Sequence, residues 1–308
     1  GETRMKYDLS KFKGIFVAMN ACFNAVGDVD TDVTRKLTRF YVEKGVKGLF
    51  VCGSMGEGLL QSIDERKRTL EIVMEEAGSE FTVIAHVGAI STRDSVELAK
   101  HAESIGAHAV SAIPCVYYRI PESSIEKHWL SIINSGALPF IIYNIPQMTG
   151  YDLSVSLLER MVMHNQVIGV KNSTMNSYQI HQFKKTGGKD FIVFNGSDKQ
   201  YLAGRIMGAE AGIGGTYGVM PELYLKMEKY FSEGKITEAQ KLQLRVNEII
   251  SEMESFHSLY GVIKTLIKLR GVDIGEPRMP LESIPEEQYP KILKLYEKIM
   301  EYIRQSSG

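Results

Sequence analysis

Short runs of apolar, β-branched residues alternate along the chain with longer stretches whose apolar residues recur at helical spacing. This alternation is typical of β-strand and α-helix units that build a parallel sheet. The runs are almost continuously hydrophobic, as expected of strands that helices cover. There are eight of them, and they read GIFVAMN from Gly14, GLFVCGS from Gly48, TVIAHVG from Thr82, AVSAIPC from Ala109, FIIYNIP from Phe140, VIGVKNS from Val167, FIVFNGS from Phe191 and AGIGGTY from Ala211.

The stretches between the runs carry helix boundary signals. Between Ser91 and Gly106, for example, apolar residues form one helical face, the serine is a suitable N-cap and the glycine follows the last turn. The chain after the eighth run has a helical pattern throughout. The expected helices there span residues 222–232, 236–255, 258–269 and 286–304.

Eight successive units favour a closed (β/α)8 barrel. A doubly wound open sheet is the alternative, but no GxGxxG motif follows the first run. We therefore predict an α/β protein with a TIM barrel at residues 14–233, an N-terminal segment at 1–13 and a C-terminal helical extension at 234–308. Met5 is a candidate initiator, which would make residues 1–4 an expression scar.

Composition and charge narrow the set of partners. Among the 308 residues, 36 Lys and Arg are balanced by 37 Asp and Glu, and no block of like charges forms a patch for nucleic acid or a membrane surface. No apolar run approaches the roughly 18 residues of a membrane helix, and the polar beginning lacks a signal-peptide core. We therefore expect a cytoplasmic protein with small-molecule partners and with no nucleic-acid or membrane partner.

Lys171 is the most informative polar residue, because it lies inside the sixth apolar run. Barrel enzymes place their active sites at the C-terminal ends of the strands. Burial there favours the neutral amine that attacks a ketone to form a Schiff base. The alternative is a structural lysine that reaches out to solvent or pairs with a carboxylate such as Glu57.

Two further residues at strand ends carry hydroxyl groups. Tyr143 ends the fifth run, where a phenol can move protons during imine chemistry; a packing tyrosine is the alternative. Ser54 lies in GSMGEG, whose glycines expose backbone amides that can hold a carboxylate. The alternative for this segment is an ordinary glycine turn with a helix cap.

The histidines show no spacing that is typical of a metal site, so we expect no metal. His86 lies within the third run. We interpret it as a core histidine rather than a catalytic base, because no second histidine or carboxylate shares its spacing.

Four motifs in order resemble the N-acetylneuraminate lyase and dihydrodipicolinate synthase family of pyruvate-dependent class I aldolases. They are GSMGE with Ser54, the pair Tyr117–Tyr118, YNIP with Tyr143 and GVKNS with Lys171. The resemblance runs from about Gly14 to the C-terminus. It implies a Schiff base between Lys171 and pyruvate, proton transfer by Tyr143, and a relay through Ser54 to Tyr117, which would enter a neighbouring subunit's site. It also implies a homotetramer that uses no cofactor. Pyruvate is bound covalently, through the Schiff base at Lys171.

The resemblance further implies where substrate binds. Ser54 and Met55 would hold the pyruvate carboxylate through their amides, and the carbonyl of Ile213 would line the same pocket. The implied substrate-binding residues are Ser54, Met55, Ser173, Gly196, Asp198, Lys199, Ile213, Gly215 and Tyr260, of which Ser173, Gly196, Asp198, Lys199 and Gly215 would face a sugar-acid tail.

Within the family, the motifs resemble the lyase branch more closely. The synthase branch is expected to carry an arginine after YNIP, and here that segment is QMTG with Met148, which cannot donate the hydrogen bonds. The chain also departs from the lyase pattern, with Met55 in place of a threonine, Lys199 in place of a glutamate and Gly215 in place of a serine.

We therefore expect reversible carbon–carbon cleavage of a sialic-acid-like or 2-keto-3-deoxy sugar acid to pyruvate and an aldehyde. The departure at Lys199 leaves another sugar or an acidic compound open as the aldehyde partner. Dihydrodipicolinate synthase activity is the alternative, and a non-catalytic barrel that binds keto acids is an alternative of another class. No cluster of ligands supports metal or flavin chemistry.

Overall fold

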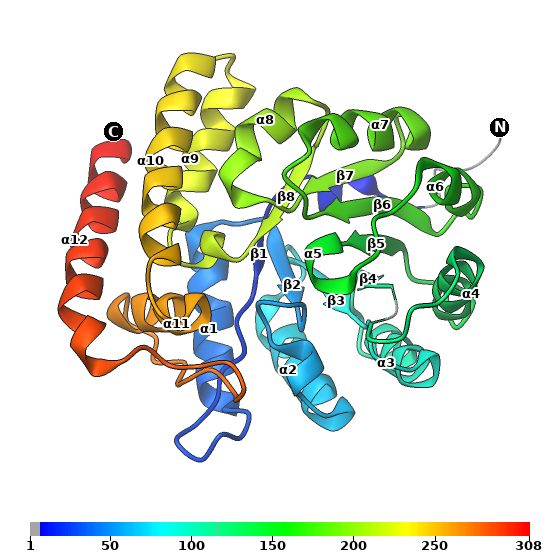
Figure 1. Cartoon of the computed structure of the whole chain (residues 1–308), viewed down its shortest axis with the longest axis horizontal. Coiled ribbons are helices and arrows are strands. Elements are labelled where there is room, and N and C mark those ends of the chain that lie inside the picture. Colours follow the sequence, from blue (N-terminus) through cyan, green and yellow to red (C-terminus); the bar gives the residue numbers. More distant parts are fainter. Residues whose placement is uncertain (1–6, 115) are drawn as a thin grey trace.

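The computed structural model describes residues 7–114 and 116–308, so the expectation for residues 1–4 lies outside the described chain. Eight strands close into a barrel, and each pairs in parallel with the next (Figure 1). The strands are β1 (Gly14–Ala18), β2 (Gly48–Val51), β3 (Thr82–His86), β4 (Ala109–Ala112), β5 (Phe140–Asn144), β6 (Val167–Asn172), β7 (Ile192–Asn195) and β8 (Ala211–Gly214). The predicted TIM barrel is confirmed, and the closure of β8 onto β1 excludes the open sheet.

Helices surround the barrel as an outer layer (Figure 1). The helices of the described chain are α1 (Thr31–Lys44), α2 (Ile63–Ala77), α3 (Thr92–Ser104), α4 (Glu122–Ile133), α5 (Pro146–Thr149), α6 (Val155–Met161), α7 (Ser177–Gly187), α8 (Tyr201–Ile206), α9 (Pro221–Ser232), α10 (Ile236–Glu254), α11 (Leu259–Leu269) and α12 (Tyr289–Ser306), and the short α5 lies over the barrel rather than in the outer layer. As predicted, Ser91 caps α3, where its side chain accepts the amide of Asp94 at 3.1 Å.

Short 3-10 turns join these elements, and they are η1 (Leu9–Phe12), η2 (Gly58–Leu60), η3 (Asp198–Gln200), η4 (Thr216–Gly218) and η5 (Glu286–Gln288). The last predicted helix, 286–304, therefore begins as η5 and continues as α12. Pro290 lies in the first turn of α12, where its fixed φ suits the helix and its missing amide proton costs no hydrogen bond.

Two apolar cores hold the barrel together. The larger core lies between the outward faces of the strands and the surrounding helices. The smaller one fills the barrel itself with Phe16, Phe50, Ile141, Phe194 and neighbouring side chains, and η1 contributes Phe12 to it. Because side chains pack the interior, the barrel is a solid platform and functional groups gather at its C-terminal rim.

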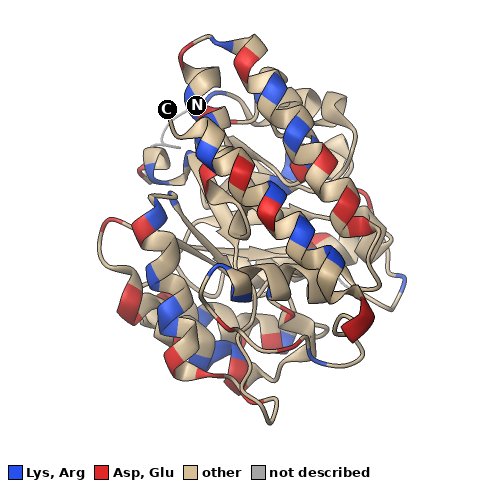
Figure 2. Cartoon of the chain, turned by 90° about the vertical axis from the view of Figure 1, so that its left-hand side faces the viewer, with Lys and Arg blue, Asp and Glu red and all other residues tan. Residues whose placement is uncertain are grey.

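The helices that follow the barrel pack along one of its sides. In Figure 1, α10 and α12 run next to α9, and α11 crosses below them. Figure 2 shows acidic and basic residues interspersed on this side, in keeping with the net charge of −1. In the part of the chain that the structure describes, no helix is long and apolar enough to span a membrane.

Candidate active site

A pocket of about 350 Å³ opens at the C-terminal ends of the strands. Every predicted site residue except Tyr117 lines it, namely Ser54, Met55, Tyr143, Lys171, Ser173, Gly196, Asp198, Lys199, Ile213, Gly215 and Tyr260. The pocket also has lining residues that sequence reasoning missed, among them Gln147, Met175, Thr216, Ile250 and Glu254. Gln147 and Thr216 follow strand ends, a signal that could have found them. Nothing local marks Ile250 and Glu254, which come from α10.

Lys171 lies on β6 directly opposite Tyr143 of β5 in the barrel ladder. Only 5% of its surface is exposed. Its Nζ lies 3.9 Å from the centre of the Tyr143 ring and 4.5 Å from that of Phe50. Among the described residues, no hydrogen-bond or ion-pair partner holds this amine. The amine is therefore shielded from bulk water and free to meet a ligand in the pocket.

Lys171 neither pairs with Glu57 nor reaches out to solvent. Glu57, the carboxylate considered as its partner, forms an ion pair with Lys264 instead, at 2.9 Å between Nζ and Oε2. A lysine that reaches out to solvent would also be far more exposed than Lys171 is. The amine of Lys171 instead lies against the rings of Tyr143 and Phe50 and lines the pocket.

Tyr143 and Ser54 meet beside this amine. The Tyr143 hydroxyl lies 3.3 Å from Ser54 Oγ, so its partner is a side-chain hydroxyl and not the backbone expected of a packing tyrosine. Tyr260 of α11 donates a hydrogen bond to the Ser54 carbonyl at 3.1 Å. Burial raises the pKa of Tyr260 to about 12, which keeps this hydroxyl protonated and able to donate.

The segment that carries Ser54 has an unusual backbone. Cys52 and Glu57 both adopt left-handed φ values, 63° and 51°. A side chain at Gly58 would run into the carbonyl of Cys52, so this glycine is required by close packing. The cap of α2 comes from Ser62, which lies outside GSMGEG. The segment is therefore a tightly specified turn rather than an ordinary helix-capping loop.

Helix α11 and the loop after it hold this turn in place. The carboxylate of Glu57 is fully buried, and besides Lys264 it accepts the backbone amide of Arg278 at 2.7 Å. Lys264 in turn donates to the carbonyl of Glu276 at 3.1 Å. Tyr260 and Lys264 lie one helical turn apart, so the same face of α11 contacts the turn at both places.

Between Lys171 and the opening of the pocket, Asp198 faces Thr216. The Asp198 carboxylate accepts the Thr216 amide at 2.9 Å and the Thr216 hydroxyl as well. Withdrawal from water raises the pKa of Asp198 to about 6, although both hydrogen bonds favour the ionised form. A side chain at Gly214 would overlap this carboxylate.

Two of the departures from the lyase pattern fit each other here. A β-carbon at position 215 would meet the methyl group of Met55, so Gly215 leaves the space that the methionine fills. The third departure, Lys199, pairs with Glu254 at 2.6 Å between Nζ and Oε1. Glu254 of α10 therefore places a negative charge beside the Lys199 ammonium group in the pocket.

Comparison with known proteins identifies the family. Residues 11–299 match the Dihydrodipicolinate synthetase family. The chain belongs to this family. An N-acetylneuraminate lyase of Mediterraneibacter gnavus is 46% identical over 285 residues, which cover 91% of this chain and 90% of the relative. N-acetylneuraminate lyase 2 of Escherichia coli O6:H1 is 34% identical over 94% of this chain and 95% of its own.

Solved structures agree with this membership of the Dihydrodipicolinate synthetase family. The wild-type sialic acid aldolase of Ruminococcus gnavus superposes with a TM-score of 0.94 and 43% identity over 96% of this chain and 99% of the other. The protein is thus a pyruvate-dependent class I aldolase, a carbon–carbon lyase. The synthase alternative has less support.

Tyr117 is the one residue of the predicted family set that the chain does not bring to the pocket. Its side chain is 88% exposed, and it stacks edge-to-face on Tyr118 with ring centres 5.1 Å apart. Its φ of 74° is left-handed, which is uncommon for an aromatic residue. Within a single chain, Ser54 and Tyr143 therefore meet without Tyr117.

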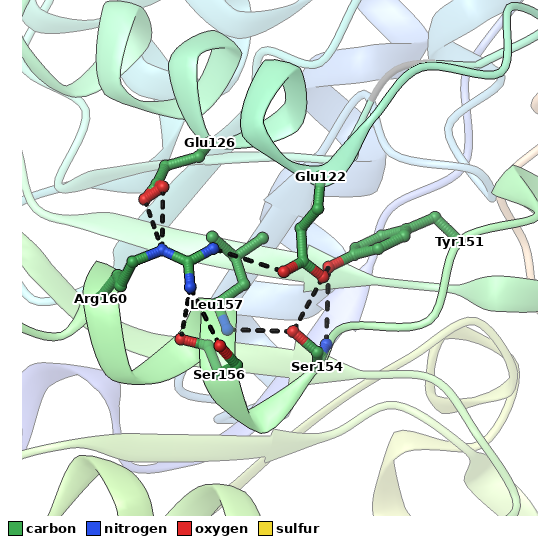
Figure 3. A network of polar contacts seen from close by, with 7 residues as sticks. All are labelled: Glu122, Glu126, Tyr151, Ser154, Ser156, Leu157 and Arg160. Carbon is green, nitrogen blue, oxygen red and sulfur yellow. Dashed lines mark hydrogen bonds and ion pairs between the residues drawn. The ribbon is translucent and has the colours of Figure 1, made fainter.

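The segment between β5 and α6 forms one wall of the pocket and carries Met148. A polar network ties it to α4 (Figure 3). Glu122 accepts hydrogen bonds from Tyr151 at 2.6 Å and from Ser154 at 2.8 Å, and Arg160 joins the same carboxylate at 3.3 Å. The Tyr151 hydrogen bond is the main cause that lowers the pKa of Glu122. No arginine is among the described residues that line the pocket, in line with the weaker support for the synthase branch of the family.

His86 has the surroundings of a core histidine. A neutral imidazole can donate from Nδ1 to the Cys52 carbonyl at 2.8 Å and accept the Ile113 amide at Nε2, at 3.3 Å. Burial lowers its pKa, which suits the neutral form. Within residues 7–114 and 116–308, no group of three or more His, Cys, Asp and Glu side chains is arranged to hold a metal ion.

Proposed function

We propose that the protein cleaves N-acetylneuraminate, or a closely related 2-keto-3-deoxy sugar acid, reversibly to pyruvate and an aldehyde in the cytoplasm. Lys171 forms the Schiff base. The observation that carries this proposal is the buried Lys171 amine beside Tyr143, whose hydroxyl meets Ser54. The names of the relatives support the choice of substrate, since they are N-acetylneuraminate lyases.

The proposed reaction needs only the protein's own groups. The Lys171 amine adds to the C2 ketone of the sugar acid and water leaves, which gives an iminium ion. Loss of the C4 hydroxyl proton then breaks the C3–C4 bond, and its electron pair moves into an enamine as the aldehyde departs. Protonation at C3 and hydrolysis release pyruvate and restore the amine.

Tyr143 is the proposed proton carrier in these steps, because its ring lies against the Lys171 amine and its hydroxyl meets Ser54. The amides of Ser54 and Met55 are the proposed anchor for the pyruvate carboxylate. Ser173, Gly196, Asp198, Lys199, Ile213, Gly215 and Tyr260 line the same pocket and are the proposed contacts of the remaining substrate.

The protein is proposed to act as a homotetramer in which Tyr117 of the partner subunit extends the relay at Ser54. Large apolar side chains support such contacts, because Ile90, Tyr117 and Tyr118 are exposed on loops that follow strand ends, and Met148 is exposed on α5. The left-handed backbone of Tyr117 is a local strain that a neighbouring subunit would stabilise. Light scattering coupled to size-exclusion chromatography measures this assembly, and a monomer would contradict it.

Borohydride reduction in the presence of pyruvate, followed by peptide mass spectrometry, tests the Schiff base. We expect one modified peptide, which carries the adduct on Lys171. A matched assay follows pyruvate release from N-acetylneuraminate and from several 2-keto-3-deoxy sugar acids. Cleavage without any trapped adduct would overturn the mechanism. An adduct without cleavage of any sugar acid would favour the non-catalytic barrel that only binds keto acids.

A further inference from the structure

Two opposite charges lie on the wall of the pocket away from its buried end. Lys199 comes from η3, and Glu254 is the last residue of α10. Their side chains form an ion pair at 2.6 Å and stay 36% and 45% exposed, so a ligand in the pocket can reach both. We propose that this pair selects an aldehyde with a neutral, hydroxyl-rich tail and disfavours an acidic tail, with Glu254 as the specificity-determining residue. The inference rests on the proposed aldolase function.

The charge balance supports this selectivity. Lys199 alone would attract a carboxylate tail, because an ammonium group donates hydrogen bonds and carries a positive charge. The Lys199 ammonium group is already paired with Glu254. An acidic tail must therefore displace the Glu254 carboxylate and then lie beside that carboxylate. Like charges at such close range oppose binding. The lysine therefore does not by itself predict an acidic substrate.

A polyhydroxylated tail meets no such obstacle. Each hydroxyl both donates and accepts, so it can donate to Glu254 and accept from Lys199. An exposed ion pair is worth only about 0–1 kcal/mol, so hydroxyl groups can open it at little cost. The pair thus offers a neutral polyol one hydrogen-bond donor, Lys199, and one acceptor, Glu254.

Contacts other than the ion pair fix the distance between α10 and η3. Asn247 of α10 donates to the Lys199 carbonyl at 2.9 Å. Gln243 of the same helix donates to the Asp198 carbonyl at 3.1 Å and to the Asn247 side chain at 2.8 Å. These bonds remain when Glu254 is replaced. A substitution of Glu254 therefore changes the charge of the wall and not its position.

The test is the condensation of pyruvate with D-mannose and with D-mannuronate, which differ only in a terminal hydroxymethyl or carboxylate group. The measured quantity is kcat/KM for mannuronate divided by kcat/KM for mannose. Glu254→Gln releases Lys199 and should raise this ratio by about threefold to tenfold. Lys199→Gln leaves Glu254 unpaired and should lower the ratio by a similar factor. The double variant, whose wall is neutral again, should return near the wild-type ratio.

Glu252→Gln is the matched control. Glu252 lies on the same helix but binds Lys298 at 2.6 Å and does not line the pocket. Its variant should keep the wild-type ratio. An unchanged ratio in Glu254→Gln, or the same change in Glu252→Gln, would overturn the inference while leaving the aldolase function intact. If the wild-type protein neither traps pyruvate nor condenses it with either aldehyde, the proposed function fails, and the inference fails with it.

Discussion

The two ends of the pocket are built differently. At the inner end, Lys171 and Tyr143 are buried and stand on adjacent strands, so the barrel ladder sets their separation. At the outer end, Lys199, Glu254 and Met148 are exposed and come from a 3-10 turn, a long helix and a short helix. Bond formation needs reacting groups held to within a fraction of an ångström, which strands provide. Substrate choice can instead change through exposed side chains that the fold does not depend on.

The ion pairs at the two ends of the pocket also differ in how deeply they are buried. Glu57 and Lys264 are almost completely buried behind the turn that carries Ser54, whereas Lys199 and Glu254 lie in contact with water. Losing one partner of a buried pair leaves a charge that water cannot solvate. When an exposed pair loses one partner, water solvates the charge that remains. Substitutions at the inner end should therefore cost either much activity or much stability, depending on the residue, whereas substitutions at the outer end should cost little stability and chiefly change the choice of substrate.

Lys171→Met gives the largest expected loss, because Lys171 is the only lysine among the described residues at the inner end and is the proposed imine-forming group. We expect kcat/KM for sugar-acid cleavage to fall by about 10⁴ or more. The thermal midpoint should stay close to that of the wild-type protein, since methionine fills a similar apolar volume under the Tyr143 and Phe50 rings. If borohydride still trapped pyruvate on this variant, another lysine would be the nucleophile.

The buried pair behind the Ser54 turn should dominate stability. Glu57→Gln leaves Lys264 without its counter-charge, and we expect the free energy of unfolding in urea to fall by about 3–5 kcal/mol. The double variant Glu57→Gln/Lys264→Met should recover most of that loss. Lys67→Met breaks an exposed pair with Glu97, 2.8 Å in length, and should lower the free energy of unfolding far less than Glu57→Gln does. Equal losses in the buried and exposed variants would contradict the contrast between them.

Tyr143→Phe removes only the hydroxyl of the proposed proton carrier at the inner end. The phenyl ring stays over the Lys171 amine, while the hydroxyl that meets Ser54 at 3.3 Å is lost. We expect kcat to fall by about 10²–10³ with a smaller change in KM, because the proposed role of the hydroxyl is proton transfer rather than binding. Steady-state kinetics separates the two parameters. A rise in KM with kcat unchanged would assign the tyrosine to binding alone.

The inner end could be predicted from sequence for a physical reason. Each strand is a continuous apolar run, and barrel closure brings the residues that end those runs to one rim. Lys171, Tyr143 and Ser54 were found this way, and only β7 begins one residue later than its run, at Ile192. Local patterns were enough because the relevant geometry follows from the order of the strands.

The outer end could not be predicted as well. Glu254 reaches the pocket because α10 packs on η3, a contact between distant segments that leaves no local pattern. The pairing of Glu57 with Lys264 depends in the same way on where α11 lies. Helical spacing predicted that these helices exist but not which strand ends they would contact. Lys199 was therefore correctly placed in the pocket while its charge partner was missed.

Asp198 lies between the two ends, and its titration gives the smallest expected effect. Its folded-state pKa of about 6 is above the ordinary 3.8, so the folded protein holds this proton more tightly than the unfolded chain does. The resulting stabilisation is present below about pH 4 and is lost as the pH rises through about 6, because the folded state then carries a partly desolvated carboxylate. Asp198→Asn cannot ionise. Relative to the wild-type protein, the variant should gain about 2–3 kcal/mol of unfolding free energy between pH 4 and pH 7, measured by urea titration. A constant difference across this range would mean that the Thr216 hydrogen bonds compensate the ionised carboxylate fully and that burial does not raise the pKa of Asp198.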